Sequence, residues 1–127
     1  MVKYKFNRDA SVITLYTKIE GKIIVKPKLA LDTGSTYMMI PWEIADVLGL
    51  RPEACKERID IITASGVEKA PLVTLKSVTV LGKEVKKVKA VVHDLPQKSY
   101  VDGLLGLSFF RKFRFCLDFR KGILELD

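Results

Sequence analysis

The most informative segment is Leu29-Ala30-Leu31-Asp32-Thr33-Gly34-Ser35-Thr36, in which a carboxylate directly follows an apolar run and precedes a turn of small residues. A carboxylate at the buried end of a strand is costly unless hydrogen-bond donors surround it, because burial disfavours the charged form. The N–H groups and hydroxyls of Thr33, Gly34 and Ser35 can supply such donors. The segment therefore indicates a functional carboxylate, although Asp-Thr-Gly-Ser is also ordinary turn chemistry between strands.

The remaining chain is dominated by short β-branched and apolar runs separated by turn residues. The expected strands are Ser11 to Ile19, Ile23 to Leu31, Arg58 to Thr63, Val67 to Val80, Val85 to Val92, Phe113 to Phe119 and Ile123 to Leu126. Glycine-bearing turns lie at Glu20-Gly21-Lys22, Ser65-Gly66, Leu81-Gly82-Lys83 and Lys121-Gly122. Between Phe113 and Phe119 apolar and more polar residues alternate, which predicts one buried face with Cys116 on the other.

Only two stretches have helical character. The first runs from Pro41 to about Leu48, and the second follows Ser108 as its N-cap and turns Phe109, Phe110 and Phe113 inward. Because helices do not alternate with strands, the sequence predicts a mainly β fold with a closed or strongly curved sheet and two short helices.

The length of 127 residues predicts a single domain over 1–127, whose first ten residues form either an extra edge strand or a flexible arm. No apolar run reaches the roughly 20 residues of a membrane span, and no signal peptide is visible, so we expect a cytoplasmic protein with no membrane partner. Cys55 and Cys116 lack C-x-x-C spacing, which favours free thiols over a disulfide or a zinc site.

The net charge of +7 is densest at Lys83, Lys86, Lys87 and Lys89. These lysines interleave with valines, as in a strand with one solvated face, and no aromatic residues accompany them for base stacking. We therefore expect no nucleic-acid partner.

Residues 29–40 resemble the first signature of the aspartic peptidase family, in which apolar residues precede Asp-Thr/Ser-Gly and an apolar strand follows. The segment Val101-Asp102-Gly103-Leu104-Leu105-Gly106-Leu107-Ser108-Phe109-Phe110 is similar to the family's second signature, two apolar residues and a glycine before a short helix. The resemblance covers Ser11 to Leu126 and is to prokaryotic, single-domain members of the retropepsin type. It implies a closed acid-protease barrel with one lobe per chain.

The resemblance also implies the site residues. Asp32, Thr33 and Gly34 would be catalytic, with Thr33 reaching across a twofold axis and Gly34 contacting substrate. Ser35, Leu105 and Gly106 would support them, and the Ser35 hydroxyl is expected to bond the outer carboxylate oxygen.

A second implied feature is the flap, a hairpin that closes over substrate and matches Ile62-Thr63-Ala64-Ser65-Gly66-Val67. Ser65 and Gly66 would then contact substrate, although such a tip could equally be an ordinary hairpin turn. Apolar cleft walls are expected from Ile61, Ile62, Leu104 and Leu105.

The family mechanism requires two carboxylates that share one proton, and this chain has one Asp-Thr-Gly. The resemblance therefore implies a homodimer that hydrolyses peptide or protein substrates through a water held between two copies of Asp32, with no metal or other cofactor. Ile123 to Asp127 is the expected dimer-forming strand, because retropepsin dimers interleave their chain ends.

Two other functions were weighed. His93 is the only histidine and, with Asp94 nearby, could belong to a Ser-His-Asp or Cys-His site, but no Gly-x-Ser-x-Gly elbow accompanies it and Asp102 is better read as a turn residue. The more serious alternative is a noncatalytic dimeric module that keeps the fold and binds peptide in its cleft. The intact Asp-Thr-Gly argues against it, because two like charges at a twofold axis cost stability.

Overall fold

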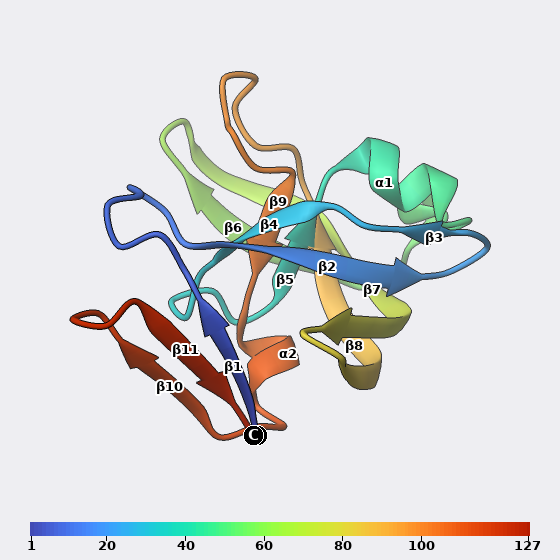
Figure 1. The fold of residues 1–127 in the computed structure, drawn as a ribbon. Helices are drawn as coiled ribbons and strands as arrows, with labels where there is room; N and C mark the ends of the chain where they lie inside the picture. Colours follow the sequence, from blue (N-terminus) through green and yellow to red (C-terminus); the bar gives the residue numbers. More distant parts are fainter.

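The computed structural model describes residues 1–127 and confirms the mainly β class (Figure 1). Its elements are β1 (Val2–Lys5), β2 (Thr14–Glu20), β3 (Ile24–Val25), β4 (Lys28–Leu31), β5 (Met38–Ile40), α1 (Trp42–Val47), η1 (Pro52–Ala54), β6 (Arg58–Thr63), β7 (Gly66–Val80), β8 (Lys83–Val92), β9 (Gly103–Leu105), α2 (Leu107–Phe110), β10 (Phe115–Asp118) and β11 (Ile123–Leu126). The two α-helices agree with the expected pair of short helices.

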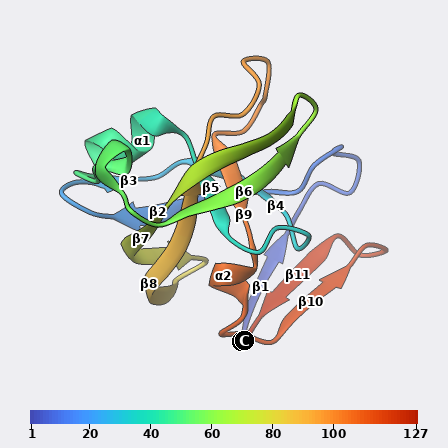
Figure 2. The same ribbon diagram turned by 180° about the vertical axis from the view of Figure 1, so that it is seen from behind.

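A ring is closed by six strands, in the order β2, β4, β9, β5, β8 and β7. The larger sheet has the order β3-β2-β4-β9-β5-β8-β7-β6, and an additional pairing of β2 with β7 joins its two halves. The β4–β9 and β5–β8 pairs are parallel, and the other pairs are antiparallel. Closure leaves few free edges, and the β6–β7 hairpin projects from the ring (Figure 2).

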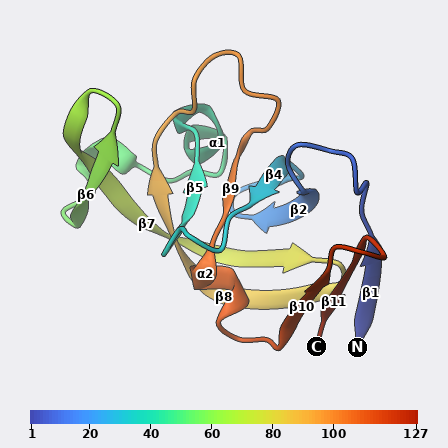
Figure 3. The ribbon, with the colours of Figure 1, turned by 90° about the vertical axis from the view of Figure 1, so that its left-hand side faces the viewer.

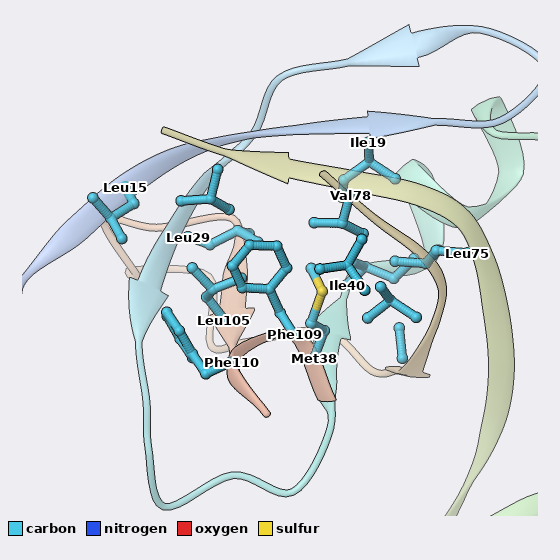
Figure 4. Close-up of a cluster of buried hydrophobic side chains, with 14 of the residues drawn as sticks. Leu15, Ile19, Leu29, Met38, Ile40, Leu75, Val78, Leu105, Phe109 and Phe110 are labelled. Carbon is cyan, nitrogen blue, oxygen red and sulfur yellow. The ribbon is translucent and has the colours of Figure 1, made fainter. Parts of the chain in front are cut away.

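The core fills the ring with aliphatic side chains from opposite strands around Phe109 of α2 (Figure 4). Phe109 is fully buried and contacts Phe110 and Phe113, with ring centroids 5.3 and 5.1 Å apart. Burial of each large aliphatic side chain stabilises the fold by roughly 1.5–3 kcal/mol. The core therefore fixes the positions of β4, β5 and β9, and Asp32 directly follows β4.

The chain ends form a separate three-stranded sheet of order β1-β11-β10, with the two termini side by side (Figure 3). The first residues are thus an edge strand and not a flexible arm, and the amino group of Met1 lies 3.5 Å from the carboxylate of Asp127. Both edges of β11 are paired within the chain, by β1 and β10, and the expectation that Ile123 to Asp127 is the dimer-forming strand stays a prediction. The free edges of this sheet belong to β1 and β10.

Several strand boundaries differ from those expected. The run from Ile23 to Leu31 is interrupted before β4, where Pro27 has no N–H to donate to a ladder. The run ending at Phe119 stops at Asp118, whose Oδ1 accepts the Lys121 N–H at 3.0 Å and starts the turn. Phe119 is consequently 65% exposed and not on the buried face.

The second helix begins two residues earlier than expected, at Leu107, and Ser108 is not its N-cap. Gly106 occupies the cap position, without a side-chain cap. The Ser108 hydroxyl instead accepts the Met38 N–H at 2.9 Å and donates to the Lys89 carbonyl at 2.7 Å. It therefore joins β5 to β8 through α2.

The β7–β8 hairpin turns at Leu81 and Gly82, both with positive φ, as the glycine signal predicted. Lys87 also has positive φ, at 57°, which resets the alternation of β8. Lys86 and Lys87 are therefore both exposed between the buried Val85 and Val88, so the lysines lie on the solvated surface.

Candidate active site

The position of Asp32 follows from the strand before it. β4 lies between β2 and β9, and its parallel pairing with β9 sets Leu31 opposite Leu105. The Asp32 N–H extends this ladder by donating to the Leu105 carbonyl at 3.0 Å. The backbone of Asp32 is thus held by the sheet, while its side chain is only partly buried.

The turn after Asp32 closes on the carboxylate itself. Oδ1 accepts the Gly34 N–H at 3.0 Å, and the Asp32 carbonyl accepts the Ser35 N–H at 3.2 Å. A Cβ at residue 34 would lie 3.3 Å from Oδ1, which is tighter than an ordinary contact. Glycine therefore allows the backbone of residue 34 to approach the carboxylate without a steric conflict.

Ser35 does not make the expected bond to the carboxylate. Its hydroxyl donates to the Tyr37 carbonyl at 2.7 Å, two residues further along the chain. The local carbonyl offers a nearby acceptor in the bend that leads into β5. Ser35 thus shapes the turn and leaves Asp32 with the Gly34 N–H as its one side-chain hydrogen bond within the chain.

Thr33 lies on the outer side of the turn and is exposed. It borders a hollow of about 420 Å³ whose other walls come from the segment after β1 and from β10. Phe6, Leu31 and Leu117 are among its apolar lining residues. The Asp32 turn therefore adjoins the terminal sheet.

The second segment singled out in the sequence packs directly under the turn. The Ser35 carbonyl accepts the Leu107 N–H at 2.8 Å, and a Cβ at residue 106 would lie only 2.7 Å from that same carbonyl oxygen. Only glycine fits at Gly106. Leu105 is fully buried in the core, so it supports the Asp32 backbone but is not the cleft wall that was expected (Figure 4).

A groove of about 490 Å³ runs beneath the projecting β6–β7 hairpin. Ile61, Ile62 and Leu104 line it as expected, and Met39 forms part of its wall. It shares the lining residues Met39 and Ile61 with a second hollow, which Ser35 and Thr36 also line. The second hollow thus lies between the groove and the turn that carries Asp32, although Asp32 itself lines neither.

Ser65 and Gly66 lie at the tip of this hairpin, and both are exposed. The Ser65 N–H donates to the Thr63 hydroxyl at 3.2 Å, and that hydroxyl donates to the Gly66 carbonyl at 3.1 Å. Gly66 has a φ of 120°, a conformation that side-chain-bearing residues rarely adopt. Ser65 borders the groove.

The other acid–base candidates are occupied elsewhere. His93 lies 3.8 Å from Glu68, Asp94 Oδ1 accepts the Trp42 N–H at 3.0 Å, and Asp102 Oδ2 accepts the Lys28 N–H at 2.8 Å. No serine or cysteine is hydrogen-bonded to His93, so His93 and Asp94 do not form a Ser-His-Asp or Cys-His site. Asp102 instead fastens the start of β4, since its own N–H donates to the Lys28 carbonyl.

Sequence reasoning missed Glu68, His93 and Tyr37 as neighbours of the groove and the turn. The alternation of β6 and β7 could have placed Glu68 beside Ile61, but the proximity of His93 depends on the end of β8.

No three His, Cys, Asp or Glu side chains gather in a way that could hold a metal ion. None of the helices has the length and apolar character needed to cross a membrane.

The sequence matches the family model described as aspartyl protease over residues 16–109. The structure is similar to the crystal structure of a retropepsin-like aspartic protease from Rickettsia conorii, with a TM-score of 0.74 and 31% sequence identity. That match covers 98% of this chain and 88% of the other. No curated protein matches the sequence.

Proposed function

Because the chain belongs to the aspartyl protease family and has the retropepsin-like fold, we propose that it is an endopeptidase whose active form is a homodimer. Asp32 of each chain would lie at the shared site, with Thr33 and Gly34 beside it. The observation that carries the proposal is the Asp32 turn, in which the sheet holds the backbone while the carboxylate stays partly accessible.

One chain supplies one such carboxylate, and hydrolysis of this kind needs two. Two carboxylates about 3 Å apart share a proton, because like charges at that distance cannot both ionise. The ionised Asp32 takes a proton from a water as its oxygen attacks the scissile carbonyl carbon. The protonated partner donates to the carbonyl oxygen, and proton transfer to the amine then releases it.

The surface around Thr33 supports a dimer. Thr33 is exposed, and the neighbouring terminal sheet has free edges at β1 and β10 and an exposed Phe119. A twofold axis beside the turn would bury these groups in an isologous contact. Ser35, Leu105 and Gly106 would hold the turn rigid rather than contact substrate.

The groove beneath the β6–β7 hairpin is the proposed substrate site. The hairpin would act as the flap, with Ser65 and Gly66 closing over the peptide, and Ile61, Ile62 and Leu104 would contact apolar side chains.

We place the enzyme in the cytoplasm, a compartment in which the free thiols of Cys55 and Cys116 would persist.

The test compares wild type, Asp32→Asn and the control Asp46→Asn, which alters an exposed aspartate of α1. Each is incubated with an unstructured protein substrate from about pH 3 to 8, with and without pepstatin, and fragments are followed by mass spectrometry. Oligomeric state is measured in the same buffers. Cleavage by wild type and Asp46→Asn, but not by Asp32→Asn or in the presence of the inhibitor, is expected.

A folded dimer that cleaves nothing at any pH would contradict the peptidase proposal and favour the peptide-binding module. Cleavage that persists in Asp32→Asn would contradict the role of Asp32. Activity of a monomer at all concentrations would contradict the shared site.

A further inference from the structure

The groove beneath the flap hairpin is acidic, although the protein as a whole is basic. Glu68 and Asp94 line it together with His93, and none of its twelve lining residues is lysine or arginine. The chain contains 22 Lys and Arg against 15 Asp and Glu. A groove without lysine or arginine is therefore a local departure from the surface charge.

The carboxylate of Glu68 is not committed to a partner in the chain. The one basic side chain within 4 Å of it is His93, whose Nε2 lies 3.8 Å away, beyond hydrogen-bonding distance. Neighbouring carboxylates outside this groove are paired with lysines, Asp60 with Lys69 at 2.8 Å and Glu57 with Lys89 at 3.5 Å. Glu68 is thus available to a ligand in a region where other acids are neutralised.

The groove also offers apolar surface beside the carboxylate. Glu68 lies directly across the hairpin from Ile61, and Met39 and Leu104 belong to the same lining. Long basic side chains bury their methylene stems on apolar surface while the charged head reaches a polar group. An apolar wall that ends at a free carboxylate is complementary to that shape.

We propose that Glu68 makes this groove select a lysine or arginine side chain of the substrate. Asp94 adds a second negative charge to the lining, with Oδ1 held by the Trp42 N–H. His93 directly follows β8 and lies 3.8 Å from Glu68. The inference rests on the proposed function and names a substrate class for it.

The experiment uses a panel of peptides in which lysine replaces norleucine at one position at a time. Cleavage is measured with the wild-type protein, and binding is measured by fluorescence anisotropy with Asp32→Asn, so that recognition is read independently of catalysis. Both measurements are repeated in Glu68→Gln, Glu68→Lys and the control Glu84→Gln, an exposed residue of β8 outside the groove.

We expect lysine to be preferred at one position by about fivefold to tenfold, because a charge-assisted hydrogen bond to a half-exposed carboxylate gives a modest gain. Glu68→Gln should reduce the preference to about twofold or less, Glu84→Gln should retain it, and Glu68→Lys should favour glutamate at that position instead.

Peptides that are cleaved or bound with no lysine preference, or with a preference that persists in Glu68→Gln, would overturn the inference and leave the proposed function standing. A lysine preference in binding without any cleavage would support the inference and contradict the peptidase proposal. Failure of Asp32→Asn to bind any peptide would overturn the inference as well.

Discussion

The hydroxyl of Ser108 offers a quantitative test of how the region around Asp32 is held. Its oxygen bridges the Met38 N–H, at the start of β5, and the Lys89 carbonyl of β8. In Ser108→Ala both backbone groups lose this partner in a half-buried position, which should cost about 2 kcal/mol of the free energy of unfolding. For 127 residues, whose unfolding entropy is roughly 0.27 kcal/mol per K, this corresponds to a fall of about 7 °C in Tm.

The assay is thermal and urea unfolding followed by circular dichroism at one fixed protein concentration, because association would shift the apparent stability. Ser99→Ala is the control, since Ser99 is exposed and its hydroxyl makes no hydrogen bond in the chain. Ser108→Asp separates the bridge from the N-cap role expected from sequence, because aspartate is a good cap but an ionised carboxylate cannot donate to Lys89. A loss below about 0.5 kcal/mol in Ser108→Ala, or a stable Ser108→Asp, would refute the bridge.

Two further predictions concern the β7–β8 hairpin and its neighbour. Lys87→Asn should raise the free energy of unfolding by about 0.5–1 kcal/mol, because asparagine tolerates the positive φ that costs lysine roughly 1–2 kcal/mol. The control Lys86→Asn changes a residue in ordinary strand backbone and should not raise it. Equal effects of the two substitutions in urea titrations would contradict this prediction. The pKa of Glu20 lies below its ordinary value of 4.5, chiefly because the Ser77 hydroxyl donates to the carboxylate and secondly because Lys76 lies beside it. The stabilising contribution of the ionised Glu20 is therefore present above pH 4.5 and is lost as pH falls through the lower pKa of the folded state. Ser77→Ala should therefore lose stability less steeply than wild type as pH falls below about 4.5, and identical pH profiles of unfolding would exclude this linkage.

The strands that turn residues delimit could be predicted because their signals are local. β6 and β11 have the bounds expected from sequence, since alternating apolar residues and glycine turns specify a paired strand without knowledge of its partner. The closed ring was also expected, from the absence of alternating helices together with the family resemblance. The bounds of the long β7 strand were close to those expected, because glycine-bearing turns mark both of its ends.

The short strands β5 and β9 were not delimited, because each has three residues and depends on distant partners. β9 fits beside β5 only because residue 103 is glycine, where a Cβ would overlap the Met39 carbonyl oxygen. Glycine lowers strand propensity, so the residue that makes this close pairing possible also hides it from sequence reasoning. The partners of Ser108 were missed for a related reason, because they come from β5 and β8.

The candidate site shows the same division between local and distant causes. The identity of Asp32 could be inferred because its turn needs small residues in a fixed order, and the Gly34 N–H does reach its carboxylate. The position of that turn is fixed from the other signature, by the Leu105 carbonyl and by the close approach of Gly106. The Ser35 hydroxyl follows the nearest acceptor, the Tyr37 carbonyl, rather than the carboxylate. Within one chain Asp32 is therefore rigid in its backbone but lightly bonded at its side chain, which is the state required of a carboxylate that must share a water with a second copy of itself in the proposed homodimer.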